Sequence, residues 1–119
     1  MEGILVLKWT DQVGMVIKAD YPKGVGSALS PATLLHIYNM HFSGKGAGVV
    51  GLTIESANFS SYSPGLECRD FVAIILNLLE NPDDYEEKLI EISKKILDNL
   101  KDDKYIEMLP SLFEEFSSI

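Results

Sequence analysis

The sequence predicts an α/β fold of the α+β sandwich type, with a five-stranded, mostly antiparallel sheet and three helices in the order β-β-α-β-β-β-α-α. Three observations predict this fold. Five short runs rich in aliphatic and β-branched residues are separated by turn signals, which is typical of strands. Neighbouring runs are joined by short turns, which favours antiparallel pairing. One helical pattern in the first half and two at the end can cover both faces of one sheet.

The first two strands are expected to form a hairpin over residues 3–21. Residues 3–9 read GILVLKW, a continuous apolar run that is too short for a helix and suits a strand buried on both faces. Turn residues follow at 10–14, where Gly14 can adopt a positive φ. Strand character returns over residues 15–21, before a break at Pro22.

A helix is predicted from Ser30 to about Phe42, with Ser30 as its N-cap and Pro31 at its first position. Glycines beyond residue 43 can end it in a left-handed conformation. At 100° per residue, the face expected to contact the core carries Leu34, Leu35, Tyr38 and Phe42. The opposite face carries Thr33, His36 and Met40.

Three further strands are predicted between residues 47 and 78. Residues 47–55 form a strand with several small residues, and residues 59–63 form a short strand after a turn at 56–58. The strongest strand signal is FVAIIL within residues 70–78. This last strand is expected to lie in the centre of the sheet.

Two helices complete the fold. The first opens at residues 81–84, NPDD, where proline suits the first turn and the acids suit the positive end of the helix dipole. Its apolar stripe consists of Tyr85, Leu89, Ile92, Ile96 and Leu100. After a break at residues 102–103, the last helix is expected over residues 104–116, where Pro110 should kink or divide it.

Length and charge limit the possible functions. The 119 residues suit one domain that spans residues 1–119, and a hydrophobic fraction of 46% excludes a disordered chain. The net charge is −8, and Arg69 is the single arginine. We expect no nucleic-acid partner, because nucleic-acid binding depends on lysine and arginine to release counterions.

Cysteine content and hydropathy indicate a compartment. Cys68 is the single cysteine, so no intrachain disulfide can form. The first residues lack the basic region of a signal peptide, and no apolar run approaches the roughly 18 residues of a membrane span. We therefore expect a cytoplasmic protein with no integral membrane segment.

Residues 46–51, GAGVVG, match the G-x-G-x-x-G letters of a dinucleotide-binding loop. Such a loop follows a strand and opens a helix, so that the helix N-terminus meets the pyrophosphate. Here a helix precedes the glycines and a strand follows them. We therefore predict no bound dinucleotide and no other cofactor, and interpret the glycines as residues that let another backbone approach a strand closely.

Metal binding and catalysis are also not expected. His36 and His41 are five residues apart, and on a helix they diverge by about 140°, so they cannot share a metal ion in the usual i, i+4 manner. Cys68 and His41 stay open as a nucleophile pair, although no orienting group or oxyanion hole can be identified. The acid pairs at residues 83–84 and 114–115 are explained by helix starts and solvated faces.

Three segments carry a family resemblance: residues 3–9 (GILVLKW), 82–86 (PDDYE) and 105–113 (YIEMLPSLF). With the element order, they resemble the longin fold, and within it a group of small single-domain longin-like proteins of Asgard-type archaea. The resemblance covers essentially the whole chain, and its motifs are packing and capping signatures. The related roadblock fold has the same sheet but begins with a helix, so longin is the better match.

The resemblance implies a sheet order of 2-1-5-4-3, with one helix on one face and two on the other. It implies that the third strand lies at an edge. Longin and roadblock domains lack active sites, dimerise through edge strands and neighbouring helices, and form platforms for small GTPases or trafficking complexes. The implied function is a non-enzymatic interaction module whose partner is a small GTPase or another longin or roadblock protein, in a homodimer or heterodimer.

Specific surfaces follow from this hypothesis. We expect a partner to bind the first helix through Thr33, His36 and Met40. We expect the dimer to form along an edge strand that comprises Ala47, Gly48, Val49, Val50, Gly51, Leu52, Thr53 and Ile54.

Other interpretations stay open. Trp9 is interpreted as a core or rim aromatic, with a surface anchor as the alternative. A small-molecule sensor is the second function, with Asn39, Thr53 and Tyr62 facing a pocket. A hydrolase that uses Cys68 is a more remote third.

Overall fold

The computed structural model describes residues 1–44, 47–54, 57–65 and 67–116. It confirms the predicted order of strands and helices and adds two short 3-10 turns, η1 and η2. The elements are β1 (Gly3–Thr10), β2 (Gly14–Tyr21), η1 (Val25–Ala28), α1 (Pro31–Gly44), β3 (Gly48–Ile54), β4 (Ala57–Ser63), β5 (Asp70–Leu76), η2 (Pro82–Tyr85), α2 (Glu86–Leu97) and α3 (Lys104–Phe116).

The five strands form one antiparallel sheet in the order β2-β1-β5-β4-β3. This is the order that the longin resemblance implied, and it places β1 and β5 in the interior of the sheet. Val6 of β1 lies opposite Ala19 on one side and Val72 on the other. Because an interior strand has its backbone groups paired on both sides, these two apolar runs can be buried completely.

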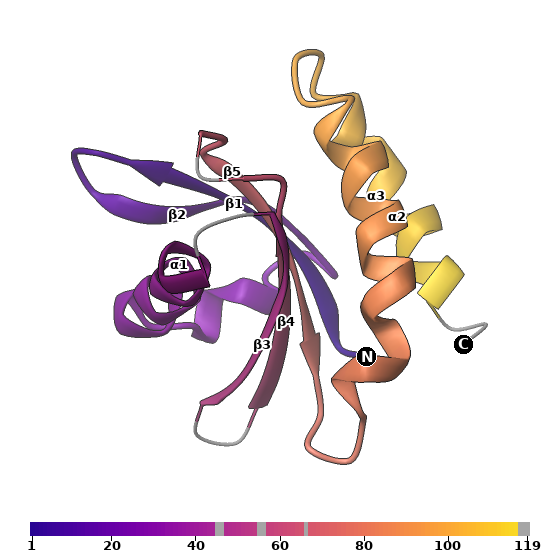
Figure 1. Cartoon of the computed structure of the whole chain (residues 1–119). Helices are drawn as coiled ribbons and strands as arrows, with labels where there is room; N and C mark the ends of the chain where they lie inside the picture. The colour runs from indigo at the N-terminus through magenta and orange to yellow at the C-terminus, as the bar shows by residue number, and fades with distance from the viewer. Residues whose placement is uncertain (45–46, 55–56, 66, 117–119) are drawn as a thin grey trace.

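Helices cover both faces of the sheet, as Figure 1 shows: α1 lies on one face, and α2 and α3 lie on the other. Successive residues of β1 alternate between the two faces. Leu5 and Leu7 pack with Ile37 in what we call the α1 core. Ile4 and Val6 pack in the α2–α3 core, whose helical members include Leu89, Ile92, Ile96, Leu109 and Phe116.

The helix α1 is rotated from its predicted orientation. Leu34 faces the sheet as expected, but the other buried positions are Thr33, Ile37 and His41. Leu35 and Phe42, which were expected in the core, are 45% and 56% exposed. The reason is that α1 carries apolar residues on several sides, so its sequence does not define one buried face, and contacts with the sheet select the orientation.

The helix α2 follows its predicted stripe but is shorter than expected. Asn81 accepts a hydrogen bond from the Asp83 N–H and caps η2, so that α2 itself begins at Glu86. Leu89, Ile92 and Ile96 are fully buried, as predicted. The helix ends at Leu97, so that Leu100 lies beyond it.

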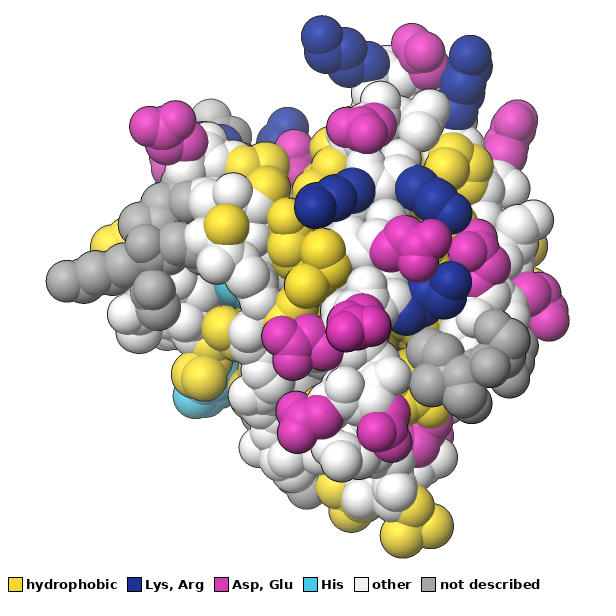
Figure 2. Space-filling view, turned by 45° about the vertical axis from the view of Figure 1, so that its right-hand side comes forward, with side chains coloured by type: hydrophobic (Ala, Val, Ile, Leu, Met, Phe, Trp, Pro, Cys, Tyr) yellow, Lys and Arg dark blue, Asp and Glu magenta, His cyan; other side chains and the backbone are white. Residues whose placement is uncertain are grey.

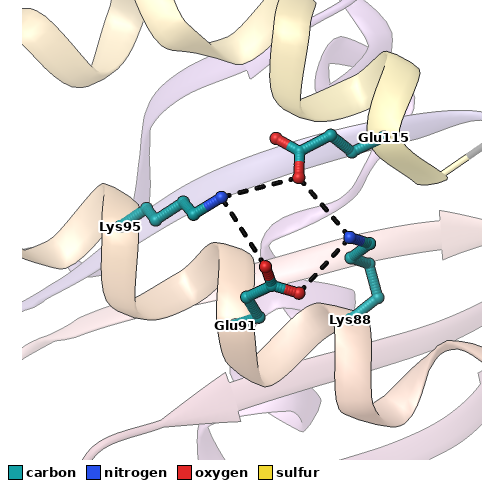
Figure 3. Close-up of polar contacts among 4 residues, drawn as sticks. All are labelled: Lys88, Glu91, Lys95 and Glu115. Atoms are coloured by element: carbon teal, nitrogen blue, oxygen red, sulfur yellow. Dashed lines mark hydrogen bonds and ion pairs between the residues drawn. The ribbon is translucent and has the colours of Figure 1, made fainter.

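The helix α3 runs from Lys104 to Phe116 through Pro110, so the proline does not divide it, and the predicted alternative of a kink stays a prediction. Its solvent-facing side is joined to α2 by ion pairs (Figure 3). Lys88 Nζ and Lys95 Nζ lie 3.4 Å and 3.5 Å from Glu115 Oε1, and both lysines also approach the carboxylate of Glu91. Exposed pairs of this kind contribute little individually, but the two that join α2 to Glu115 of α3 belong to one network with Glu91 and orient the two helices relative to each other.

Candidate interaction surface

The outer edge of β3 is the first candidate surface. Among the described residues, β3 pairs with β4 alone, from Gly48 opposite Ser63 to Ile54 opposite Ala57. The predicted edge position is confirmed, although the strand starts at Gly48, so Ala47 lies before it. An unpaired row of backbone N–H and C=O groups can accept a further strand.

This edge lacks the features that usually protect an edge strand. The segment GVVGLTI contains no charge and no proline. Its far end is tied down, because Thr53 Oγ1 donates to Asn58 Oδ1 at 2.5 Å and Asn58 Nδ2 donates to the Asn77 carbonyl at 3.1 Å. The edge of β3 is therefore an extended strand that is held by hydrogen bonds near Thr53 and has no strand paired to its outer side among the described residues.

Apolar side chains extend this edge toward α2. Val49 of β3 and Ile90 and Leu97 of α2 are partly buried and pack against the α2–α3 core. Figure 2 shows hydrophobic side chains gathered in a band near the middle of the face that it presents. Strands added to a sheet edge gain affinity from backbone hydrogen bonds and specificity from such neighbouring side chains.

The glycines of residues 46–51 do not open a helix, since the described ones lie at the start of β3 and within it. Gly46 lies outside the described residues. Gly48 has a φ of 140°, a conformation that favours glycine. At Gly51, an added Cβ would lie 3.7 Å from the Phe59 carbonyl oxygen, which is an ordinary contact. The prediction that Gly51 is a glycine because another backbone segment of this chain approaches it closely is therefore wrong.

The helix α1 is the second candidate surface, and it only partly matches the prediction. His36 and Met40 are exposed as expected. Thr33 is buried, its N–H donates to Ser30 Oγ at 3.2 Å, and its hydroxyl lies 3.1 Å from the same atom. Thr33 thus belongs to the N-cap of α1, and the expectation that it lies on the outer face is wrong.

Sequence reasoning missed two residues of this surface. Leu35 and Phe42 are exposed beside His36 and Met40, and we call these four residues the α1 outer face. A helix that displays three large apolar side chains differs from the usual polar outer face. The signal was present in the sequence, because apolar residues occur around the whole of α1, but it did not show which of them would be buried.

An aromatic row continues from α1 to the sheet. Trp9 stacks on Tyr38 with ring centroids 3.8 Å apart and an interplanar angle of 14°, and Phe42 follows at 6.1 Å from Tyr38. Trp9 is partly buried against the α1 core, which agrees with a rim aromatic. A groove of about 400 Å³ lies beside it, where Arg69 pairs with Asp11 at 3.0 Å and lowers the pKa of that carboxyl.

His41 is a buried residue of the α1 core. Its Nε2 lies 2.9 Å from Ser61 Oγ, and both residues are almost completely shielded from solvent. Burial lowers the pKa of His41 to about 4, so the ring is neutral at pH 7. Because no substrate can reach this pair, its hydrogen bond serves to satisfy two buried polar groups.

The proposed Cys68–His41 pair is not formed. The Cys68 thiol contacts the carbonyl of Asp70 at 3.6 Å, whereas His41 is bonded to Ser61. The three residues of the sensor hypothesis are not brought together either. Asn39 lies exposed on α1, while Tyr62 is buried in the α2–α3 core on the other face of the sheet.

The described residues form neither a metal-ion cluster nor a membrane-spanning helix. Within them, no group of three histidine, cysteine or acidic side chains could hold a metal ion. None of the described helices is long and apolar enough to cross a membrane.

The comparisons with known proteins assign no family. No protein-family model matches the chain, and no curated protein is significantly similar to it in sequence. The chain is a small α+β domain with a five-stranded antiparallel sheet in the order 2-1-5-4-3.

Proposed function

We propose that this chain is a longin-like interaction module that acts without catalysis. It pairs with a second longin-type chain along β3 and presents the α1 outer face to a small GTPase or a trafficking-type partner. The observation that carries the proposal is the open edge of β3, a strand with no charge or proline that is anchored at its end by Thr53 and Asn58.

Topology supports the longin assignment. The sheet order, and the division of one helix to one face and two to the other, agree with what the resemblance implied. Fold alone does not assign a partner. The choice of a protein partner therefore rests on the two surfaces, the β3 edge and the α1 outer face.

Charge placed on the β3 edge tests the dimer. Gly51 is exposed and has room for a side chain, so Gly51→Lys leaves the fold intact and places like charges near each other in a symmetric dimer. We expect the mass from light scattering to fall from two chains to one. Gln12→Lys, in the exposed β1–β2 turn, makes the same charge change away from the edge and should not alter the mass.

Mixing variants sharpens this test. Gly51→Lys and Gly51→Glu should each be monomeric, and their mixture should recover the dimer because opposite charges then face each other. A wild-type chain that is monomeric at all accessible concentrations would remove the edge dimer, as would equal dimer masses for all four proteins.

The α1 outer face is tested with small GTPases from the same source. We expect His36→Glu/Met40→Glu and Phe42→Glu to weaken binding, since each places charge on an apolar contact surface. Lys23→Glu, at an exposed position beyond β2, is the control. Binding that is equal for all of these proteins would eliminate the α1 outer face as the docking site.

A further inference from the structure

The turn between β5 and η2 displays two adjacent leucines. Leu78 is 55% exposed and Leu79 is 97% exposed. Sequence reasoning placed Leu78 at the end of a strand, but β5 ends at Leu76. A single exposed leucine is common on protein surfaces, whereas two neighbours at the tip of one turn form a small apolar projection. We call these residues the leucine turn.

The leucine turn is held in place by its flanking residues. The Asn77 N–H donates to Glu80 Oε1 at 2.9 Å, and the Leu79 N–H donates to Asn77 Oδ1 at 2.9 Å. The Tyr85 hydroxyl donates to Glu80 Oε2 at 2.6 Å and ties the turn to η2. A turn that is already ordered loses little conformational entropy when its leucines are buried by a partner.

The surroundings of the leucine turn are acidic. From residue 70 to residue 87 the sequence contains no lysine or arginine. Asp83, Asp84, Glu86 and Glu87 line one groove beside α2, and none of them forms an ion pair among the described residues. These charges disfavour an anionic bilayer and favour a protein surface with an apolar groove and nearby cations.

The chain itself carries a groove of that kind. A groove of about 520 Å³ lies between α2 and α3, where Met108 and Leu112 are its apolar lining, and Lys95 and Lys104 its cations. Glu107 is also in the lining, and Lys95 is already paired with Glu91 and Glu115, so Lys104 is the one cation of this lining that forms no ion pair among the described residues. Figure 3 shows the ion pairs of Lys95 with Glu91 and Glu115.

The leucine turn and the helix groove lie toward opposite ends of α2. In the view of Figure 2, hydrophobic side chains lie at the lower tip of the molecule, beneath acidic ones. The lysine and arginine side chains of the same view lie at mid-height and above. The 12 residues of α2 span about 18 Å, so the leucine turn cannot enter the groove of its own chain.

We propose that the leucine turn of one copy inserts into the groove between α2 and α3 of a second copy. Charge complementarity selects this occupant, since the acidic rim of the turn meets Lys104 beside the apolar lining of Met108 and Leu112. The contact joins two different surfaces, so it is head-to-tail, and each added copy leaves a free turn at one end and a free groove at the other. The contact is distinct from the symmetric pairing along β3.

The contact is small, so assembly depends on protein concentration. Two leucines and a charged rim bury far less than the roughly 1,200–2,000 Å² of a stable interface. The net charge of −8 on each copy also opposes association. We therefore expect an average mass that rises with concentration and returns to its starting value on dilution.

Two variants test the contact in a Gly51→Lys background, which removes pairing along β3. The turn variant is Leu78→Ser/Leu79→Ser, and the groove variant is Lys104→Glu/Ser111→Glu. All four positions are exposed, so the fold should be retained. Sedimentation velocity should show association weakened about tenfold or more in each variant, because leucine burial or charge pairing is lost. Val13→Ser, at another exposed apolar turn residue, should leave association unchanged.

Mixing the two variants gives the decisive result. The turn variant still has an intact groove, and the groove variant still has an intact leucine turn. Their mixture should form a one-to-one dimer that does not grow further. Association that is unchanged in the turn variant would overturn the proposal, as would a mixture in which no dimer forms.

The alternative occupant is a lipid bilayer. Flotation with phosphatidylcholine vesicles provides this comparison. One result would overturn self-association in favour of lipid. In that result the Gly51→Lys protein binds vesicles, the turn variant does not, and the solution mass of the Gly51→Lys protein stays constant with concentration. At dilutions where the head-to-tail contact is dissociated, the masses of wild type, Gly51→Lys and Gly51→Glu depend on pairing along β3 alone, so failure here is distinguishable from failure of the β3 dimer.

Discussion

At the scale of residues, the most informative position is His41. An imidazole is rarely buried without a partner, and here Ser61 supplies one at 2.9 Å while Phe71 packs with its ring centroid 5.3 Å away. Burial keeps the ring uncharged, so protonation and folding oppose each other at this residue.

The stability of the protein should therefore depend on pH through His41. The folded pKa is about 4, below the ordinary value of 6.5, so between these values the unfolded chain binds a proton that the folded chain does not. The free energy of unfolding should fall as the pH falls through this window, by about 3 kcal/mol in total. Urea unfolding at several pH values measures this effect against His41→Gln, which should lack that part of the slope. Parallel curves for the two proteins would contradict the assignment.

Two buried serines should respond differently to alanine. Ser93 Oγ is buried and has no hydrogen-bond partner among the described residues, whereas Ser61 Oγ is bonded to His41. Ser93→Ala should leave the stability unchanged or raise it slightly, while Ser61→Ala should cost about 1–3 kcal/mol because it leaves His41 unsatisfied. Chemical unfolding of both variants checks the contrast, and an equal loss in the two would refute it.

At the scale of elements, α1 and α2 show what a sequence can and cannot predict. In α2, all six charged residues lie outside the stripe that faces the sheet, so periodicity predicted Leu89, Ile92 and Ile96 as core residues correctly. In α1, apolar residues occur on all sides, and the buried face depends on partners far along the chain. His41, for example, is placed by Ser61 and Phe71.

The candidate surfaces could likewise be predicted from the sequence only in part. The edge position of β3 followed from the family resemblance, and the openness of the edge from its uncharged, proline-free sequence. The α1 outer face could be predicted only in part, because Thr33 is bound by the N-cap serine and Phe42 turns outward. The leucine turn was missed because an apolar run in the sequence does not show at which residue its strand ends. In the structure, the hydrogen bonds of Asn77 and Glu80 form the turn that follows the strand.

Truncation of α1 side chains tests its orientation. Ile37 is fully buried, so Ile37→Ala should destabilise the fold by about 2–5 kcal/mol. Leu35→Ala, the matched change on the α1 outer face, should stay within about 1 kcal/mol. Thermal or urea unfolding measures both, and a larger loss for Leu35→Ala would restore the orientation that periodicity predicted.

At the scale of the whole molecule, the sheet separates two cores that share its central strands. The α1 core and the α2–α3 core lie on opposite faces of β1 and β5, and the outer edge of β3 and the α1 outer face lie outside both of them. Interaction at these surfaces therefore does not require the cores to open. The net charge of −8 acts over the whole chain and opposes any self-association.

Salt should strengthen pairing along β3. This strand is uncharged, so the main long-range charge effect in a dimer is repulsion between two acidic chains. Raising the ionic strength shortens the Debye length from about 30 Å at 0.01 M to about 8 Å at 0.15 M and screens that repulsion. Sedimentation equilibrium at pH 7 should show a lower dissociation constant at higher salt. A dimer that dissociates on adding salt would point to charged contacts instead.

The stacking of Trp9 on Tyr38 provides an optical probe of one layer. Trp9 is the single tryptophan of the chain, and its ring touches α1 and not α2 or α3. Its emission therefore reports the separation of α1 from the sheet, while the tyrosines Tyr85 and Tyr105 lie on the side of α2 and α3. Tryptophan fluorescence and far-ultraviolet circular dichroism, followed in one titration, would show whether the two layers unfold together or α1 leaves first.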